Sequence, residues 1–195
     1  MMEKKLDDVY GMLRQADETE EWEVGMVPAS LCELTPSVGQ AMKEVLLLAA
    51  NLPFAHVLRS INFIWAVDDV GKMHVSVEEV ALIDGATVMP GLPVRRGVDA
   101  RVSKDQKLGH PCVAPTGNAR IAGEIYIDES TDEEGLLAWT LNVRSGRFHR
   151  TKERRPNLNQ IKNAAKMFAR SMGLPISLDL IADMRMGSLD SGVSS

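Results

Sequence analysis

Alternation of side chains in two stretches, residues 121–128 and 137–144, restricts the fold of this chain more than any other pattern. A β-strand turns successive side chains to opposite faces, so apolar residues at every second position predict half-buried strands. The acidic segment 129–135 lies between the two stretches and supplies turn residues. The pattern therefore predicts an antiparallel β-hairpin with one face against a core.

The alternation sorts this hairpin into two rows of side chains. The row expected to face the core is Ile121, Gly123, Ile125, Ile127, Leu137, Trp139, Leu141 and Val143. The opposite row brings together a carboxylate, a phenol, a hydroxyl, an amide and a guanidinium, from Glu124, Tyr126, Thr140, Asn142 and Arg144. Such a face can orient a polar ligand, because arginine binds anions in a bidentate manner. The alternative is an ordinary solvated sheet face with a cross-strand Glu–Arg pair.

Three further elements complete the expected fold. Residues 36–50 repeat apolar side chains at helical spacing, and a second amphipathic helix follows Asn157 and ends at Gly173. Residues 61–80 predict another hairpin, with His74 as a solvated or cross-strand residue on its polar face. The order helix, hairpin, long loop, hairpin, helix predicts an α+β fold. Its mainly antiparallel sheet is built from two hairpins and packs against two main helices.

The length of 195 residues suits one domain. We expect residues 35–180 to form it, preceded by an acidic N-terminal arm, residues 1–34, and followed by a flexible tail, residues 181–195. The charge run "DETEEWE" within the arm is expected to be solvated, with Trp22 as a candidate dock onto the domain. Residues 84–118 are punctuated by Gly and Pro and predict a long loop, with short strands near Val98 to Val102 as an alternative within it.

Composition argues against several classes of protein. A net charge of −5 disfavours nucleic-acid binding as the main role, and the longest apolar run, residues 45–52, is too short to span a bilayer. The first residues carry no signal-peptide pattern, so we expect a cytoplasmic protein or one secreted by a signal-independent route. The four histidines and two cysteines lack metal-ligand spacing, so no metal site is expected.

Positive charge is concentrated after the second hairpin. Nine lysines and arginines lie between Arg144 and Arg170, against one acid, Glu153. In an acidic chain this predicts an anionic partner such as a nucleotide, a dinucleotide or another phosphorylated small molecule. The residues expected to bind it are Asn142, Arg144, Ser145, Arg147, His149 and Tyr126. The alternative is that these cations neutralise the acidic turn or lie on the solvated face of the last helix.

Three segments, "GHPCVAPTGNARIAGEIYI", "WTLNVRSGRFHR" and "NLNQIKNAAKMF", resemble a family pattern. The pattern is His-Ser-Ser-Phe-Leu, Ala-Ala-Gly-Glu and Ser-Gly-His-Tyr, found in plant calmodulin-binding IQ-motif proteins and in bacterial and fungal effector- or toxin-like proteins. The three segments lie within residues 109–168, roughly a third of the chain. The matching positions are His110, Gly123, Glu124, Ser145, Gly146 and Phe148. Pro111 and Cys112 replace the two serines, and Arg147 replaces the second histidine.

This resemblance implies a bacterial protein of effector or toxin type. By analogy with small ADP-ribosyltransferases, we expect a transferase acting on a nucleotide-derived substrate, with NAD as the candidate. Glu124 would be the essential carboxylate and His110 would orient the substrate or shuttle a proton. One alternative is a non-enzymatic protein-binding module of immunity, adaptor or chaperone type. Another is a hydrolase with Cys112 as nucleophile and His110 as its base.

Overall fold

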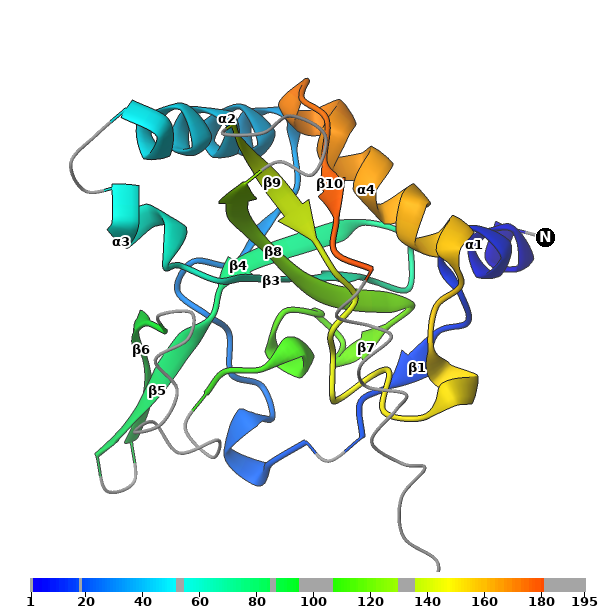
Figure 1. Cartoon of the computed structure of the whole chain (residues 1–195). Coiled ribbons are helices and arrows are strands. Elements are labelled where there is room, and N and C mark those ends of the chain that lie inside the picture. Colours follow the sequence, from blue (N-terminus) through cyan, green and yellow to red (C-terminus); the bar gives the residue numbers. More distant parts are fainter. Residues whose placement is uncertain are drawn as a thin grey trace, which may run out of the picture.

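The chain folds around one six-stranded sheet with helices on one face (Figure 1). The computed structural model describes residues 2–17, 19–51, 55–84, 87–94, 107–129 and 136–180. Its α-helices are α1 (Met2–Tyr10), α2 (Pro36–Asn51), α3 (Ala55–Arg59) and α4 (Leu158–Met172). Short 3₁₀ helices are η1 (Glu21–Glu23), η3 (His110–Cys112) and η4 (Lys152–Arg154). The strands are β1 (Arg14–Gln15), β2 (Cys32–Glu33), β3 (Phe63–Val67), β4 (Met73–Val77), β5 (Glu79–Asp84), β6 (Thr87–Pro93), β7 (Asn118–Ala119), β8 (Ile121–Glu129), β9 (Leu137–Leu141) and β10 (Ser177–Leu178).

The main sheet has the strand order β10-β9-β8-β3-β4-β2, and all its pairs are antiparallel except β10 with β9. Both predicted hairpins are present, as β3–β4 and β8–β9, and they meet through β3 and β8. Helices α2 and α4 cover one face, while η1 and η3 lie on the other side of the sheet (Figure 1). The α+β prediction, with a mainly antiparallel sheet against two helices, is confirmed.

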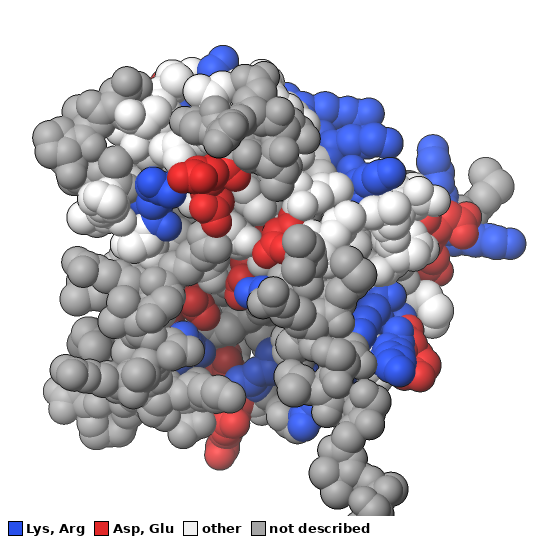
Figure 2. Space-filling view, in the orientation of Figure 1, with Lys and Arg blue, Asp and Glu red and all other residues white. Residues whose placement is uncertain are grey.

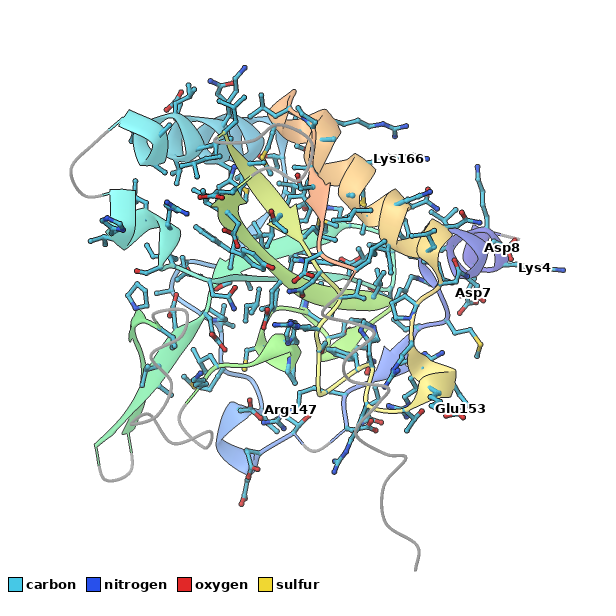
Figure 3. The ribbon with its side chains drawn as sticks, in the orientation of Figure 1. Lys4, Asp7, Asp8, Arg147, Glu153 and Lys166 are labelled. Carbon is cyan, nitrogen blue, oxygen red and sulfur yellow. The ribbon has the colours of Figure 1, made fainter. Side chains whose placement is uncertain are left out.

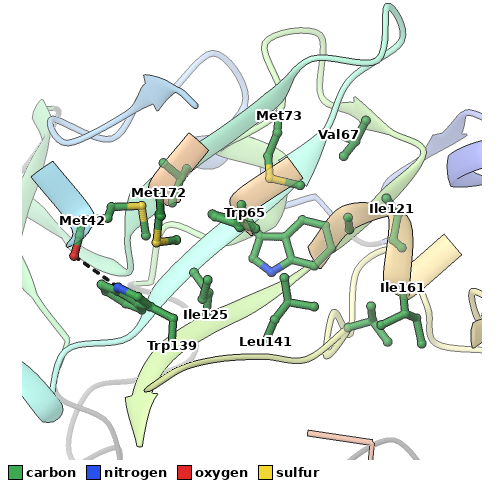
Figure 4. Packing of buried hydrophobic residues seen from close by; sticks show 14 of the residues in the cluster. Met42, Trp65, Val67, Met73, Ile121, Ile125, Trp139, Leu141, Ile161 and Met172 are labelled. Carbon is green, nitrogen blue, oxygen red and sulfur yellow. Dashed lines mark hydrogen bonds between the residues drawn. The ribbon is translucent and has the colours of Figure 1, made fainter. Parts of the chain in front are cut away.

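The predicted apolar row of the second hairpin packs under α2 and α4 and forms the main core (Figure 4). Trp65 lies at its centre, edge-on to Phe168 of α4 with ring centroids 6.1 Å apart. Trp139 is equally buried, and its Nε1–H donates to the carbonyl oxygen of Met42 at 3.1 Å. Because burying one large apolar side chain is worth about 1.5–3 kcal/mol, this row fixes which face of the sheet turns inward.

Helix α4 begins and ends where the sequence predicts. The Asn157 side chain accepts hydrogen bonds from the backbone amides of Asn159 and Gln160, which satisfies two donors of the first turn. Gly173 closes the helix in the left-handed conformation, with φ at 65°. Leu158 lies at the predicted apolar face but remains exposed, so burial begins one turn later at Ile161.

Gly123 allows two strands to approach closely. A Cβ at this position would lie 2.1 Å from the carbonyl oxygen of Asn142 and 2.8 Å from the Cα of Val143. The chain leaving β9 therefore passes directly over this glycine, and a larger residue would push it away. This contact places Asn142 against the neighbouring Glu124, the central pair of the candidate site.

The structure adds detail to the predicted fold at three places. Residues 84–93 are not all loop, because β5 and β6 form a two-stranded antiparallel hairpin outside the main sheet. His74 was predicted as a solvated or cross-strand residue, and the structure has the second: its Nε2 pairs across the hairpin with Asp68 Oδ2 at 2.8 Å, and both residues are buried. The strands β2 and β10, two residues each, add edges that the sequence did not predict. Residues 95–106, which include the possible short strands near Val98 to Val102, lie outside the described residues, as do residues 130–135 of the acidic turn and the tail 181–195.

The arm, residues 2–34, contacts the rest of the chain along its length. Helix α1 packs against α4, β1 pairs with β7, and β2 joins the main sheet beside β4. Three arm carboxylates pair with arginines that follow in the chain: Asp7 with Arg120, Asp17 with Arg154 at 2.7 Å, and Glu23 with Arg147 at 3.2 Å. The acidic charge of the arm is thus used partly within the molecule.

Candidate functional site

Glu124 and Asn142 form the centre of the candidate site, on the sheet face turned away from α2 and α4. The Asn142 side chain donates from Nδ2 to Glu124 Oε2 at 3.1 Å and accepts at Oδ1 from the Glu124 amide at 3.2 Å. Asn142 is buried, whereas Glu124 is half-buried. The predicted pairing of these two residues is confirmed, and it fixes the carboxylate in one orientation.

His110 lies beside this pair, at the start of η3. Its Nε2 is 2.9 Å from the carbonyl oxygen of Gly123, which can only accept, so Nε2 carries the proton and Nδ1 is the acceptor of a neutral ring. Burial lowers the pKa of His110, and Arg147 acts in the same direction. The hydrogen bond to Gly123 and the charges of Glu124 and Glu78 oppose that shift. His110 therefore lies within electrostatic reach of Glu124 and is held neutral by burial.

Arg144 does not join the polar row with Glu124, contrary to the sequence prediction. Strand β9 ends at Leu141, so the alternation of faces does not extend to residue 144. The Arg144 amide still donates to Asn142 Oδ1 at 2.9 Å, but its side chain is exposed. That side chain lines a small pocket next to α4, with a volume of about 80 Å³, together with Ser145 and His149.

Ser145 and His149 are both buried in the turn after β9. His149 Nδ1 is 3.0 Å from the carbonyl oxygen of Val143, which fixes Nδ1 as the protonated nitrogen. Burial lowers the pKa of His149 to about 4, with smaller contributions in the same direction from His110 and Arg14. The Ser145 Oγ has no hydrogen-bond partner among the described residues. The turn therefore presents a neutral imidazole and a buried hydroxyl whose bonding is incomplete.

Arg147 turns toward the arm rather than toward the pocket of Arg144 (Figure 3). Its Nη2 pairs with Oε2 of Glu23, whose side chain is fully buried. Glu23 was expected to be solvated within its charge run, and this expectation is wrong. The sequence carried a weak signal for a structural role of Glu23, because Glu20 and Glu23 stand three residues apart as in a capping box. The structure contains this box: the Glu20 amide donates to Glu23 Oε2 at 2.9 Å.

Tyr126 is buried in the polar row, as the alternation predicts, but a residue outside the hairpin binds its hydroxyl. The Tyr126 O–H donates to Asp179 Oδ2 at 2.8 Å, just after β10. Asp179 could not be predicted as its partner, because strand β10 is only two residues long and shows no alternation. This contact connects the C-terminal strand to the face that carries Glu124.

Cys112 lies in η3 near Glu23, where its surroundings oppose thiolate formation. Burial and the charge of Glu23 raise the pKa of Cys112 to about 12, and its Sγ donates to the carbonyl oxygen of Glu23 at 3.7 Å. A catalytic thiol needs the opposite shift. Cys112 and Glu23 also line a wider pocket of about 480 Å³ between η1 and the 111–118 segment. Glu124 and His110 line neither this pocket nor the smaller one beside Arg144.

Charges of both signs mix over the centre of the face shown in Figure 2, and lysine and arginine side chains gather over α4. That basic stripe is Lys162, Lys166 and Arg170, all exposed. In the described part of the chain, no three His, Cys, Asp or Glu side chains are grouped as a metal ion would require. No described helix combines the length and apolar character needed to cross a membrane.

Comparison with protein-family models, with curated proteins and with solved structures finds no match to this chain. The candidate site is therefore interpreted from its own geometry.

Proposed function

We propose that this chain is a transferase that acts on a nucleotide-derived substrate, with transfer of ADP-ribose from NAD as the specific reaction. One observation carries the proposal: Glu124 is held by Asn142, and the neutral His110 lies within electrostatic reach of it. A fixed carboxylate beside a neutral imidazole supplies one group that stabilises positive charge and one that accepts a proton.

In this reaction the bond between the ribose carbon and the nicotinamide nitrogen breaks, and nicotinamide leaves with the bonding electrons. The ribose carbon then carries positive charge, which the Glu124 carboxylate stabilises. An acceptor hydroxyl or amine forms the new bond to that carbon and gives its proton to His110. Since the hydrogen bond from Nε2 to Gly123 leaves Nδ1 as the acceptor, Nδ1 is the nitrogen assigned to receive it.

The test is replacement Glu124→Gln in the purified full chain, with release of nicotinamide from NAD as the measurement. Glutamine retains an oxygen for the Asn142 Nδ2 donor, so the fold should be unaffected. We expect a loss of turnover of about 100-fold or more. Glu129→Gln is the matched control, since Glu129 is an exposed acid at the end of the same strand. Unchanged turnover in Glu124→Gln, or no consumption of NAD by the wild-type chain, contradicts the proposal.

The alternative is a non-enzymatic protein-binding module, and the exposed basic stripe on α4 favours it. The arginines of the turn after β9, residues 144–155, and the acidic arm are less suited to such contacts. Two of those arginines, Arg147 and Arg154, already pair with arm carboxylates, which reduces the charge available to a partner. Charge reversal at Lys162 and Lys166 separates the two functions: it abolishes capture of an acidic partner but leaves a Glu124-dependent reaction unchanged.

A further inference from the structure

An open groove lies between α4 and β10, the strand at one edge of the main sheet (Figure 1). Its volume is about 230 Å³. Its floor is apolar and consists of two side chains of α4 and two at β10, from Ala165, Ala169, Ile176 and Leu178. Neither Glu124 nor His110 lines this groove, so the proposed reaction does not use it.

Positive charge borders the apolar floor. Lys162 and Lys166 also line the groove, and both are exposed. Within the described part of the chain neither lysine takes part in an ion pair, and none of the described residues that line the groove is acidic. Arg170 continues the row one turn further along α4 (Figure 2). Cations beside an apolar floor complement a partner that carries both acidic and apolar side chains.

The outer edge of β10 is an independent indication of a partner. The Asp179 amide faces β9, since it donates to the carbonyl oxygen of Leu141 at 2.9 Å. Successive residues of a strand direct their backbone groups to alternate edges, so the amide and carbonyl of Leu178 are directed away from β9. No described strand pairs with β10 on that side. Such an edge is a template on which an extended segment can pair.

The spacing of the cations suits an extended segment. Lys162, Lys166 and Arg170 follow one another every four residues, a step of about 6 Å along α4. In an extended strand, the side chains of one face recur every two residues, about 6.6–6.8 Å apart. A strand added beside β10 turns every second side chain toward α4, so two acidic side chains at such positions meet successive cations. Apolar side chains next to them on the same face lie on the floor of the groove.

We propose that the groove between α4 and β10 binds an extended acidic segment of a partner protein, which adds a strand to the edge of the main sheet. The backbone groups of Leu178 pair with the segment, and Lys162 and Lys166 pair with its carboxylates. Ala165 and Ala169 contact its apolar side chains. This binding does not depend on the proposed transfer reaction, and it gives the non-enzymatic alternative a defined binding mode.

Fluorescence anisotropy of a labelled peptide, titrated with the full chain at fixed ionic strength, tests the proposal. The probe is the capped peptide Thr-Ile-Thr-Glu-Thr-Glu-Thr-Ile-Thr, in which acidic and apolar side chains share one face of the strand. We expect the double replacement Lys162→Glu and Lys166→Glu to weaken binding by about tenfold or more, because it turns two attractions into repulsions. Lys4→Glu with Lys5→Glu is the control of equal charge, since both lysines are exposed on α1 and neither lines the groove.

Two further measurements separate strand addition from attraction between charges alone. Ala169→Gln keeps the charge and puts a longer side chain into the groove, so it should weaken binding by about tenfold. Glutamine is a good helix former, and an unchanged denaturant midpoint shows that the fold is retained. The same peptide N-methylated at every residue keeps its carboxylates but has no backbone donors, so its binding should be lost.

Each outcome decides the proposal. Peptide binding that responds to all three changes supports it. Absence of peptide binding, or binding that any one of them leaves intact, overturns it. Sedimentation with phosphatidylserine vesicles in place of peptide binding assigns the cations to a lipid surface, and self-association that the lysine reversal abolishes assigns the edge to a second copy of the chain; either result overturns it. Glu124→Gln should bind the peptide as the wild type does, so failure here and failure of the proposed reaction are separate results.

Discussion

Asn142 holds the Glu124 carboxylate and the end of strand β9 with the same side chain. Its Nδ2 donates to Glu124 Oε2 at 3.1 Å, while its Oδ1 accepts from the amides of Glu124 and Arg144 at 3.2 and 2.9 Å. The residue is 1% exposed, so none of these bonds is exchanged readily for water. One amide therefore connects the candidate reaction centre to the turn after β9, which carries Ser145 and His149.

Replacement Asn142→Asp should destabilise the fold, and more so at high pH. The new carboxylate would face that of Glu124, and two carboxylates that share a site raise the pKa of one of them. A carboxyl with a raised pKa in the folded state stabilises at low pH, and this stability is lost as the pH rises through that pKa. We expect a loss relative to wild type of about 2–4 kcal/mol at pH 8 and a smaller loss at pH 5.

Urea unfolding of both proteins at the two pH values measures this difference. Asn159→Asp is the control, because Asn159 is exposed on α4 and its replacement should alter stability by only about 0.5 kcal/mol. Equal losses for Asn142→Asp at pH 5 and pH 8 would show that the carboxylates do not interact.

Replacement Gly123→Ala tests the close approach of the strands. The added Cβ would lie 2.1 Å from the carbonyl oxygen of Asn142, so the chain after β9 must move. We expect a loss of about 3 kcal/mol or more in the free energy of unfolding. Gly146→Ala is a matched control in the following turn, because nothing lies within 4 Å of its Cβ position. A Gly123→Ala protein as stable as Gly146→Ala would contradict the close approach of the chain to Gly123.

The pH dependence of stability should reflect His149. Its pKa is lowered from 6.5 to about 4 in the folded protein, so the unfolded chain binds the proton first as the pH falls. The stability contributed by the neutral ring is therefore present above pH 6.5 and is lost as the pH falls toward 4. The full loss is on the order of 3 kcal/mol, and burial of His110 acts in the same direction.

Replacement His149→Asn isolates this effect, because asparagine can donate to the carbonyl oxygen of Val143 but does not titrate in this range. Unfolding curves at pH 7.5 and pH 5 should differ less in the variant than in the wild type. A wild-type protein equally stable at both values, or a variant with undiminished pH dependence, would rule out the buried neutral histidine.

The second hairpin was predictable because a strand forces alternate side chains to opposite faces. Ile125 and Trp139 faced the core and Glu124 met Asn142 on the other side, as the alternation predicts. The same reasoning failed at Arg144, because the rule applies only within the strand and β9 ends at Leu141. The backbone approach at Gly123 was predictable in kind, since a glycine inside a strand indicates close approach.

Contacts between distant parts of the chain were not predictable from local pattern. Glu23 stood in a charge run in which Glu20 and Glu21 are exposed, and only the fold brings it to Arg147. Asp179 follows a strand too short to show any period, yet it binds the Tyr126 hydroxyl. The candidate site was therefore predicted in its central pair, and its outer contacts depend on tertiary structure.

The Glu23–Arg147 pair should contribute strongly to attachment of the arm. The Glu23 side chain is fully buried, and removal of one partner leaves the other charge without compensation. We expect Glu23→Gln to lower the free energy of unfolding by about 3 kcal/mol, while the exposed neighbour Glu21→Gln has little effect. Denaturant unfolding of the two variants and of Arg147→Gln gives the measurement. The double variant should lose less than the sum of the single losses, and full additivity would mean that the two charges act independently.

The Cys112 thiol should be unreactive in the folded protein. Its pKa of about 12 leaves only about one part in 10⁴ as thiolate at pH 8, and the thiolate is the reactive form. Cys32 is more exposed, so a Cys32→Ser variant is used to observe Cys112 alone. We expect labelling of this variant by a thiol reagent at pH 8 to follow unfolding, being slow in buffer and rapid in denaturant. Catalysis should persist in Cys112→Ala, whereas fast labelling of native Cys112 together with loss of turnover would restore the hydrolase hypothesis.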